Sequence, residues 1–156
     1  MIIKAPRSIN SEDENRLRVF LAGSIEMGKA IYWQKQLEDE FAGKEDIVLY
    51  NPRRESWDNS WVQDINNVQF KEQVDWELHA MEAADLIIMY FAPDTQSPVT
   101  LLELGLFARS GKLIVCCPEG FRRKGNVDIV CRKYGVQQVN TLEEIVQAIY
   151  LTSNNK

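Results

Sequence analysis

Apolar residues along the chain gather into five short runs that alternate with segments of helical periodicity. The runs cover residues 17–22, 47–50, 86–91, 113–117 and 136–139, and their length is typical of buried strands. Helical patterns follow them over residues 30–41, 70–84, 98–110, 126–134 and 141–151. The last helical pattern begins at Thr141 with the Thr-x-x-Glu spacing of a capping box.

This alternation of strands and helices predicts a parallel sheet with helices on both faces. We expect a three-layer α/β domain of the flavodoxin-like, doubly wound type with a five-stranded sheet, in which ligands bind beyond the carboxyl ends of the strands. A single domain over residues 17–152 accounts for the pattern. We expect a polar N-terminal leader over residues 1–16, of which residues 7–16 fray, and a short tail over residues 153–156.

Composition narrows the classes of partner. A net charge of −5 argues against a protein that grips polymeric nucleic acid through its phosphates. The sequence has no signal segment and no run long enough to span a membrane, which favours the cytoplasm. Cys116, Cys117 and Cys131 lack a CxxC spacing and fit free thiols in a reducing compartment. With His79 as the single histidine, we expect no metal site.

The most informative segment runs from Ser97 to Ala108, because it sets a carboxylate among apolar residues of a helix. Ser97 and Pro98 are typical of an N-cap and a first helical residue. At helical spacing Glu103 falls in an arc formed by Val99, Leu102, Leu106 and Phe107. Burying an ionised carboxylate is costly unless the charge is paired or used, so Glu103 is a candidate catalytic residue. The alternative is a slightly rotated helix with Glu103 on a solvated rim.

Three loops that follow predicted strands carry residues suited to binding a small molecule. They are Gly23-Ser24-Ile25-Glu26-Met27-Gly28, Asn51-Pro52-Arg53-Arg54 and Ala92-Pro93-Asp94-Thr95-Gln96-Ser97. Backbone amides in the first loop can receive a phosphate or a sugar hydroxyl, or the glycines serve only the turn. The two arginines of the second loop can hold an anion by bidentate bonds, unless they are ordinary surface residues.

Further candidates lie near this expected edge of the sheet. The long segment over residues 55–69, with Trp57 and Trp61, is a plausible lid, although tryptophans more often serve packing. Glu77 flanks an apolar helix face, where charge is usually solvated, but its helix leads into the strand whose exit loop reaches Glu103. The two acids can therefore converge. Asn126, after a basic run, supplies a polar side chain to the site or caps a helix.

Several motifs together resemble the nucleoside 2-deoxyribosyltransferase family over nearly the whole chain. They are Phe20-Leu21-Ala22-Gly23-Ser24, residues 51–54, the Trp76-Glu77 pair, Ala84-Asp85-Leu86 and residues 97–105. The runs at 117–121 and 125–127 resemble its small bacterial and phage branch. The resemblance implies that Glu103, in the Glu-Leu-Gly motif, is the nucleophile. It implies that Glu77 is the second acid, where the family usually has aspartate.

The resemblance also implies substrates and partners. Six residues before the nucleophile, transferases that use free nucleosides carry aspartate, whereas the related deoxynucleoside-monophosphate N-hydrolases carry serine, as here at Ser97. Asp94, Ser97 and the Gly23-Ser24 turn would hold the sugar and any phosphate, Arg53 or Arg54 an anion, and Trp57 the base. A neighbouring subunit would complete each pocket, with Asn126 donated across the interface of a homo-oligomer.

We therefore expect an enzyme, without cofactor, that cleaves the N-glycosidic bond of a 2′-deoxynucleoside or its 5′-monophosphate. Its nucleophile would form a covalent deoxyribosyl intermediate, and the sugar would pass to a second base. One alternative is a monophosphate N-hydrolase, in which water takes the sugar. An alternative from another class is a nucleotide-binding or sensing module without turnover.

Overall fold

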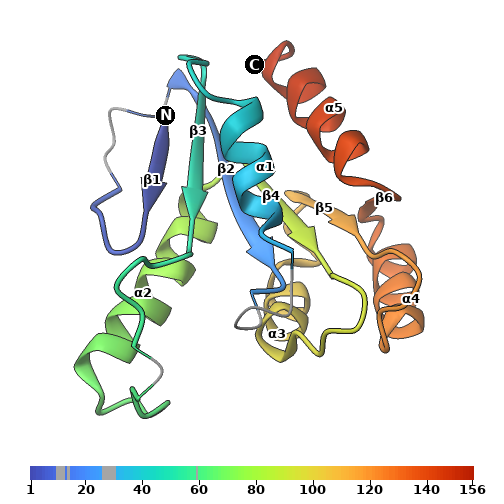
Figure 1. Ribbon diagram of the computed structural model, residues 1–156. Coiled ribbons are helices and arrows are strands. Elements are labelled where there is room, and N and C mark those ends of the chain that lie inside the picture. The colour runs from blue at the N-terminus through green and yellow to red at the C-terminus, as the bar shows by residue number, and fades with distance from the viewer. Residues whose placement is uncertain (10–12, 14, 26–30, 59) are drawn as a thin grey trace.

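The computed structural model contains a six-stranded parallel sheet whose strand order is β1-β3-β2-β4-β5-β6 (Figure 1). The structure describes residues 1–9, 13, 15–25, 31–58 and 60–156. The strands are β1 (Ile2–Lys4), β2 (Leu17–Gly23), β3 (Ile47–Asn51), β4 (Leu86–Tyr90), β5 (Leu113–Cys116) and β6 (Gln137–Val139). The prediction of a three-layer, flavodoxin-like α/β domain is confirmed, with one strand more than expected.

Five helices in the described part of the chain cover the two faces of the sheet. They are α1 (Trp33–Glu40), α2 (Val68–Ala83), α3 (Pro98–Phe107), α4 (Lys124–Tyr134) and α5 (Leu142–Ser153). Helices α1 and α5 bury apolar side chains in one cluster, and α2, α3 and α4 do so in a second. None of the helices in the described ranges combines the length and the apolar character needed to cross a bilayer.

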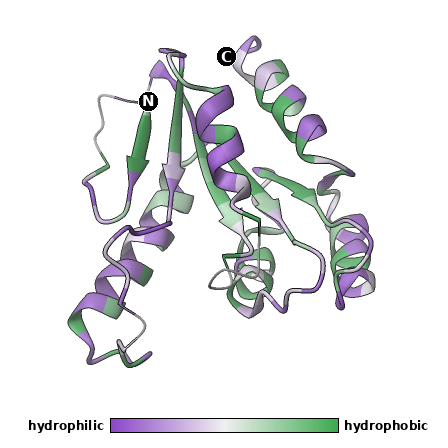
Figure 2. Cartoon of the chain, in the orientation of Figure 1, coloured by the Kyte–Doolittle hydropathy of each residue, from purple (hydrophilic) through white to green (hydrophobic). Residues whose placement is uncertain are grey.

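Alternation along the central strands explains the two clusters. Val19 and Leu21 of β2 join the α1 and α5 side, whereas Phe20 and Ala22 join the α2, α3 and α4 side. The strands are therefore apolar on both faces, and Figure 2 shows most of the central sheet in hydrophobic colours. Such strands read as continuous apolar runs, which is why the sequence pattern located them.

The sixth strand is the main correction to the expected fold. Residues Ile2–Lys4 pair with β3 at the edge of the sheet, although this segment was assigned to the N-terminal leader and no strand was expected there. A three-residue strand is too short to show a pattern of its own. Beyond it, the indole N–H of Trp76 donates to the backbone carbonyl of Arg7 at 2.7 Å, which ties the following segment to α2. Residues 10–12 and 14 of the predicted leader lie outside the described residues.

Element boundaries differ by a few residues from the expected ones. Helix α3 ends at Phe107 instead of residue 110, and α5 extends two residues past 151. Thr141 caps α5 as predicted, since its hydroxyl accepts from the backbone N–H of Glu144 at 3.2 Å. The helix expected from residue 30 begins at Trp33, and residues 26–30 lie outside the described residues.

The strand order places a topological switch point between β2 and β4. The chain leaves β2 towards β3 on one side, then returns through α2 to β4 on the other side. Gly23 at the end of β2 lies opposite Tyr90 at the end of β4. In doubly wound sheets, ligands bind outside the carboxyl ends of the strands at such a point. The loops that follow β2, β3 and β4 therefore form the expected binding edge.

Candidate active site

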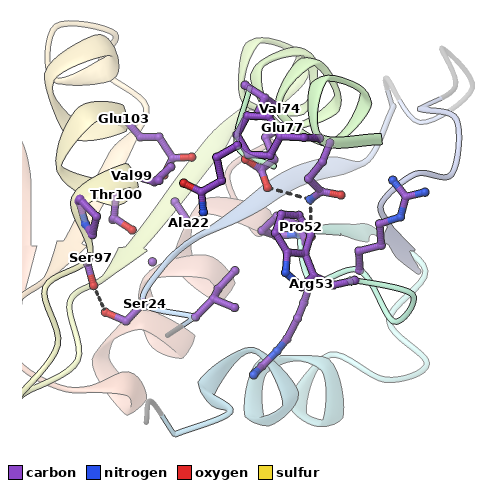
Figure 3. Close-up of a pocket in the computed structure, with 18 residues that line it drawn as sticks. Ala22, Ser24, Pro52, Arg53, Val74, Glu77, Ser97, Val99, Thr100 and Glu103 are labelled. Carbon is purple, nitrogen blue, oxygen red and sulfur yellow. Dashed lines mark hydrogen bonds between the residues drawn. The ribbon is translucent and has the colours of Figure 1, made fainter. Parts of the chain in front are cut away.

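A cavity of about 640 Å³ opens at this carboxyl edge, between α2 and α3 (Figure 3). Its walls come from the loops after β2 and β3 and from the facing sides of the two helices. Eight of the predicted site residues line it: Gly23, Ser24, Arg53, Arg54, Trp57, Glu77, Ser97 and Glu103. The convergence expected from the strand ends is therefore seen in the structure.

Glu103 lies on the buried side of α3 and is 7% exposed, which excludes the solvated-rim alternative. The apolar arc predicted around it is wrong as a buried face. Val99, Leu102 and Leu106 are 59%, 66% and 58% exposed, whereas Thr100, Glu103 and Leu104 face inward. The helix is rotated so that Leu104 reaches the core and Glu103 reaches the cavity. A stripe of large apolar side chains is left outside.

Glu77, which is half-buried, and Glu103, which is buried, form a pair of acids. Figure 3 shows both side chains reaching from their helices into the space between α2 and α3. Burial, and secondly the nearby Glu77, raises the pKa of Glu103 to about 8. Burial also raises the pKa of Glu77, against the opposing effect of a hydrogen bond from Gln73. The pair therefore retains a proton at neutral pH, and its titration belongs to both groups.

Neither acid takes part in a salt bridge within the described ranges. A buried carboxylate that only stabilises a fold is normally paired with a cation. Two carboxyl groups that share a cavity without one are typical of acid–base and nucleophilic chemistry. This geometry gives Glu103 and Glu77 the properties of a catalytic pair.

A cluster of three buried hydroxyl groups lies beside the acids. The Ser24 hydroxyl oxygen is 2.5 Å from that of Ser97 and 3.0 Å from that of Thr95, and Thr95 and Ser97 are 2.9 Å apart. Ser97 precedes α3 as predicted, but its hydroxyl makes no cap bond, and its φ of 43° is left-handed. The hydroxyl turns instead into the cluster. Thr95 donates to the carbonyl of Ala92 at 2.8 Å, so the hydroxyl protons are used within the cluster and by the backbone, and the cluster presents neutral oxygens beside the N-terminus of α3.

Gly23 allows the two central strands to approach at the cavity floor. Its φ is 145°, and a Cβ atom there would lie 2.4 Å from the carbonyl oxygen of Tyr90 and 2.9 Å from the ring of Trp33. A side chain at this position would push β2 and β4 apart. The glycine therefore serves close approach at the switch point as well as the turn.

Arginine and tryptophan side chains form the outer wall. The Arg53 guanidinium stacks on the Tyr32 ring at 4.0 Å. Arg54 lies 5.1 Å from the Trp61 ring centroid and forms a 2.7 Å salt bridge with Glu72. Trp57 lines the cavity with its ring centroid 5.1 Å from that of Trp61. The segment over residues 55–69 thus contributes to the wall, and residue 59 within it lies outside the described residues.

Three predicted site residues do not line the cavity. Asn51 is fully buried, where its amide donates to Glu38 at 2.7 Å and accepts from the backbone N–H of Arg53 at 2.9 Å. It holds the turn that presents Arg53. Asp94 and Asn126 are both exposed, at a left-handed loop position and in the first turn of α4.

The sequence interpretation missed several wall residues, of which Gln73 is the most informative. It lies one turn before Glu77 on α2, is 3% exposed and bonds both Glu77 and the carbonyl of Pro52. A polar residue four positions before a candidate acid was the available signal. Phe70, Val74 and Thr100 also line the cavity.

The cysteines lie away from this chemistry. Cys116, Cys117 and Cys131 are buried and free of disulfides, and burial raises each pKa, to about 11, 12 and 11. Within the described ranges, no group of three or more His, Cys, Asp or Glu side chains is arranged to hold a metal ion.

Comparison with known proteins supplies the family. No curated protein matches the chain. The family model described as nucleoside 2-deoxyribosyltransferase like matches residues 16–121, a stretch that includes β2 to β5, both acids and the hydroxyl cluster. The match covers more than half of the sequence and supports a deoxyribosyltransferase-like function in general. The chain belongs to the nucleoside 2-deoxyribosyltransferase-like family.

Proposed function

We propose that this protein cleaves the N-glycosidic bond of a 2′-deoxynucleoside, or of its 5′-monophosphate, and transfers the deoxyribosyl group to another base. The observation that carries the proposal is the pair of acids in one cavity, with the pKa of Glu103 raised by burial and by Glu77. A nucleotide-sensing module without turnover has no need of two such carboxyl groups beside each other.

The reaction divides into two displacements. The first starts from the form of the pair in which Glu77 holds the shared proton and Glu103 is ionised, a minority at neutral pH because burial raises the pKa of Glu103 to about 8. From this form Glu103 attacks the anomeric carbon, the N-glycosidic bond breaks, and its electron pair leaves with the base while Glu77 supplies the proton. This step leaves a deoxyribosyl ester on Glu103 and a carboxylate at Glu77. In the second, a nitrogen of an acceptor base attacks the same carbon, Glu103 departs as carboxylate, and Glu77 takes up the acceptor's proton. Configuration is retained.

One observation favours a second candidate, hydrolysis of a deoxynucleoside 5′-monophosphate. The position before α3 that would approach the 5′ end of the sugar carries Ser97, within the cluster of neutral hydroxyl groups, instead of a negative side chain. The N-terminus of α3 suits a phosphate, and the neutral Ser97 side chain does not repel one. Arg53, which lines the same cavity, adds positive charge. In this variant water attacks the anomeric carbon of the ester, Glu103 departs as carboxylate, Glu77 takes up the proton of the water, and 2-deoxyribose 5-phosphate is released.

A product assay separates these outcomes. The protein is incubated with deoxynucleosides and with their monophosphates, with and without an acceptor base, and the products are resolved by chromatography. A new nucleoside that appears only with acceptor supports transfer, and free base with sugar phosphate supports hydrolysis. Absence of turnover with every substrate would contradict both enzymatic proposals and leave the binding module.

The 5′ group can be tested independently of turnover. If the hydroxyl cluster and Arg53 bind phosphate, calorimetric titration will show tighter binding of a monophosphate than of the free nucleoside, and added salt will reduce the difference. Ser97→Asp places a negative charge there and is expected to reverse the preference. Equal affinities in the wild type that the substitution leaves unchanged would exclude a phosphate site.

We also propose that the protein works as a homo-oligomer, at least a dimer. Val99, Leu102 and Leu106 form an exposed apolar stripe on α3, and Val99 also lines the cavity. Figure 2 shows much of α3 in hydrophobic colours. A second copy packed on this stripe would cover apolar surface and close the cavity mouth. Light scattering of the wild type and of Leu102→Glu tests this, and a fully active wild-type monomer would contradict it.

A further inference from the structure

Gln73 connects the second acid to the end of β3. It lies one helical turn before Glu77 on α2, so both side chains project from the same side of the helix into the cavity wall. Gln73 is 3% exposed, and its amide nitrogen makes both of its hydrogen bonds, whereas its buried Oε1 has no hydrogen-bond partner within the described residues. Its amide nitrogen donates to the carbonyl oxygen of Pro52 at 2.7 Å and to Oε1 of Glu77 at 2.8 Å.

The Pro52 carbonyl fixes which way the Gln73 amide faces. A carbonyl oxygen can only accept, so the amino group of Gln73 must point towards Pro52. The same nitrogen contacts Glu77, which means that Oε1 of Glu77 must also accept. When Glu77 carries a proton, that proton therefore sits on its other oxygen, Oε2. One backbone carbonyl in the β3–α2 loop thus determines the protonation geometry of an acid on α2.

On this basis we infer that Gln73 is a positioning residue, which reserves Oε1 of Glu77 as an acceptor and leaves Oε2 to deliver the proton to the departing base. The inference rests on the proposed function. As the glycosidic bond breaks, the proton moves from Oε2 to the base nitrogen and Glu77 becomes a carboxylate. The N–H of Gln73 then donates to a charged acceptor, and such bonds are stronger than neutral ones. Its contribution is largest where the charge develops.

The first test is a pH profile of Gln73→Met, which keeps the side-chain length and removes the donor. We expect kcat to fall about 10-fold to 100-fold, because the acid loses its orientation, with KM changed less than twofold. The basic limb of kcat/KM moves to higher pH, because the lost hydrogen bond had lowered the pKa of Glu77. Gln69→Met, at an exposed position one turn earlier on α2, is the matched control.

A structural role for Gln73 predicts a different result. Loss of stability alone lowers the fraction of active enzyme but does not move the basic limb of the kcat/KM profile. An unmoved basic limb would therefore overturn the inference, and so would a loss of kcat no larger than that of Gln69→Met. Circular dichroism checks folding. If Gln73→Met does not fold, Gln73→Ala, which gives water room to enter, is measured in the same way and judged by the same limb.

A second readout does not need turnover. Carboxyl ¹³C resonances are titrated in the wild type and in Gln73→Met, and Glu77→Gln assigns the Glu77 signal. A higher titration midpoint of Glu77 in Gln73→Met supports the inference, and an unchanged midpoint overturns it. A wild type that cleaves no deoxynucleoside contradicts the proposed function, while this titration still decides whether Gln73 holds Glu77.

Discussion

The two ends of the central strand β4 hold carboxyl groups in opposite ways. At the amino end, Asp85 accepts from the backbone N–H of Arg18 at 2.9 Å, from its guanidinium at 2.8 and 3.1 Å, and from Lys156 at 2.7 Å. Burial acts to raise the pKa of Asp85, but these bonds outweigh it and hold the pKa well below its ordinary value. At the carboxyl end, Glu103 and Glu77 have raised pKa values and, within the described ranges, no salt bridge.

This difference separates a carboxylate that stabilises the fold from a pair suited to chemistry. Arg18 and Lys156 compensate the charge of Asp85, so that side chain joins the starts of β2 and β4 to the end of the chain. A cation in the same position would form an ion pair with Glu103, the proposed nucleophile. The cavity instead keeps a proton shared between two acids, at a cost in stability that a functional site sustains.

The largest expected effect is on activity, and it distinguishes Glu103 at the carboxyl end of β4 from Asp85 at the amino end. Glu103→Gln preserves shape but cannot act as an anionic nucleophile, so turnover is expected to fall by several orders of magnitude with the fold intact. Asp85→Asn, the same chemical change at the opposite edge, is expected to alter kcat less than about threefold. Steady-state kinetics with circular dichroism on both variants measures this. A Glu103→Gln enzyme with nearly wild-type rates would place the site elsewhere.

A smaller loss is expected within the pair itself. Glu77→Gln removes a proton donor and leaves the bond-forming group, so kcat is expected to fall about 100-fold, within the usual range for general acid catalysis. It also removes the group that helps to raise the pKa of Glu103, so the acidic limb of kcat/KM should move to lower pH. Identical losses for Glu77→Gln and Glu103→Gln, with an unmoved acidic limb, would contradict separate roles.

Much of this arrangement can be predicted from local sequence. Each apolar run of β2 to β5, and the Ser-Pro start of α3, lies within one short stretch of sequence. These signals therefore locate the ends of the strands, and with them the shared edge at which Ser24, Ser97 and Glu103 meet. The rest depends on contacts between distant segments. The burial of Asn51 depends on Glu38 of α1, and the amide orientation of Gln73 depends on the Pro52 carbonyl.

Which face of α3 is buried could not be predicted from the sequence, for a related reason. The helix carries apolar residues on all sides, so periodicity cannot tell the core face from an exposed face. The choice of Leu104 over Leu102 and Leu106 as the inward residue is made by packing against the sheet.

Removing the charge of the carboxyl group should change the free energy of unfolding in opposite directions at the two ends of β4. The pKa of Glu103 is raised from 4.5 to about 8 on folding, so the unfolded state loses this proton first as pH rises, and stability falls between those values. Glu103→Gln removes this loss and is expected to stabilise the protein at pH 9 by about 3 kcal/mol, or roughly 6–12 °C in Tm. Asp85→Asn is expected to destabilise by about 1–2 kcal/mol at pH 7.

Thermal unfolding from pH 4.5 to 9 tests both signs. The advantage of Glu103→Gln should become small near pH 4.5, where the carboxyl group is protonated in the folded state and half protonated in the unfolded state. Equal stability of Glu103→Gln and the wild type at pH 9 would show that the carboxylate of Glu103 is not desolvated as the structure indicates.

The smallest expected effect concerns Lys156, one of the two cations that contact Asp85 at the amino end of β4. Lys156→Met removes one of the two cations on Asp85 and leaves the bidentate Arg18 contact, so the free energy of unfolding should fall by only about 0.5 kcal/mol at pH 7. The folded-state pKa of Asp85 is depressed, so Asp85 stays ionised in the folded protein well below the unfolded pKa of 3.8, and the contribution of Lys156 is lost only as pH falls through the depressed folded-state pKa; it should still be present at pH 3. Added salt should also shrink the difference, because the pair is partly exposed.

Denaturant unfolding at pH 7 and pH 3, at low and high salt, measures these changes. A loss at pH 7 as large as that of Asp85→Asn would mean that Lys156 is the principal partner of Asp85, and that the chain end does more than the β2–β4 contact to keep this carboxylate ionised.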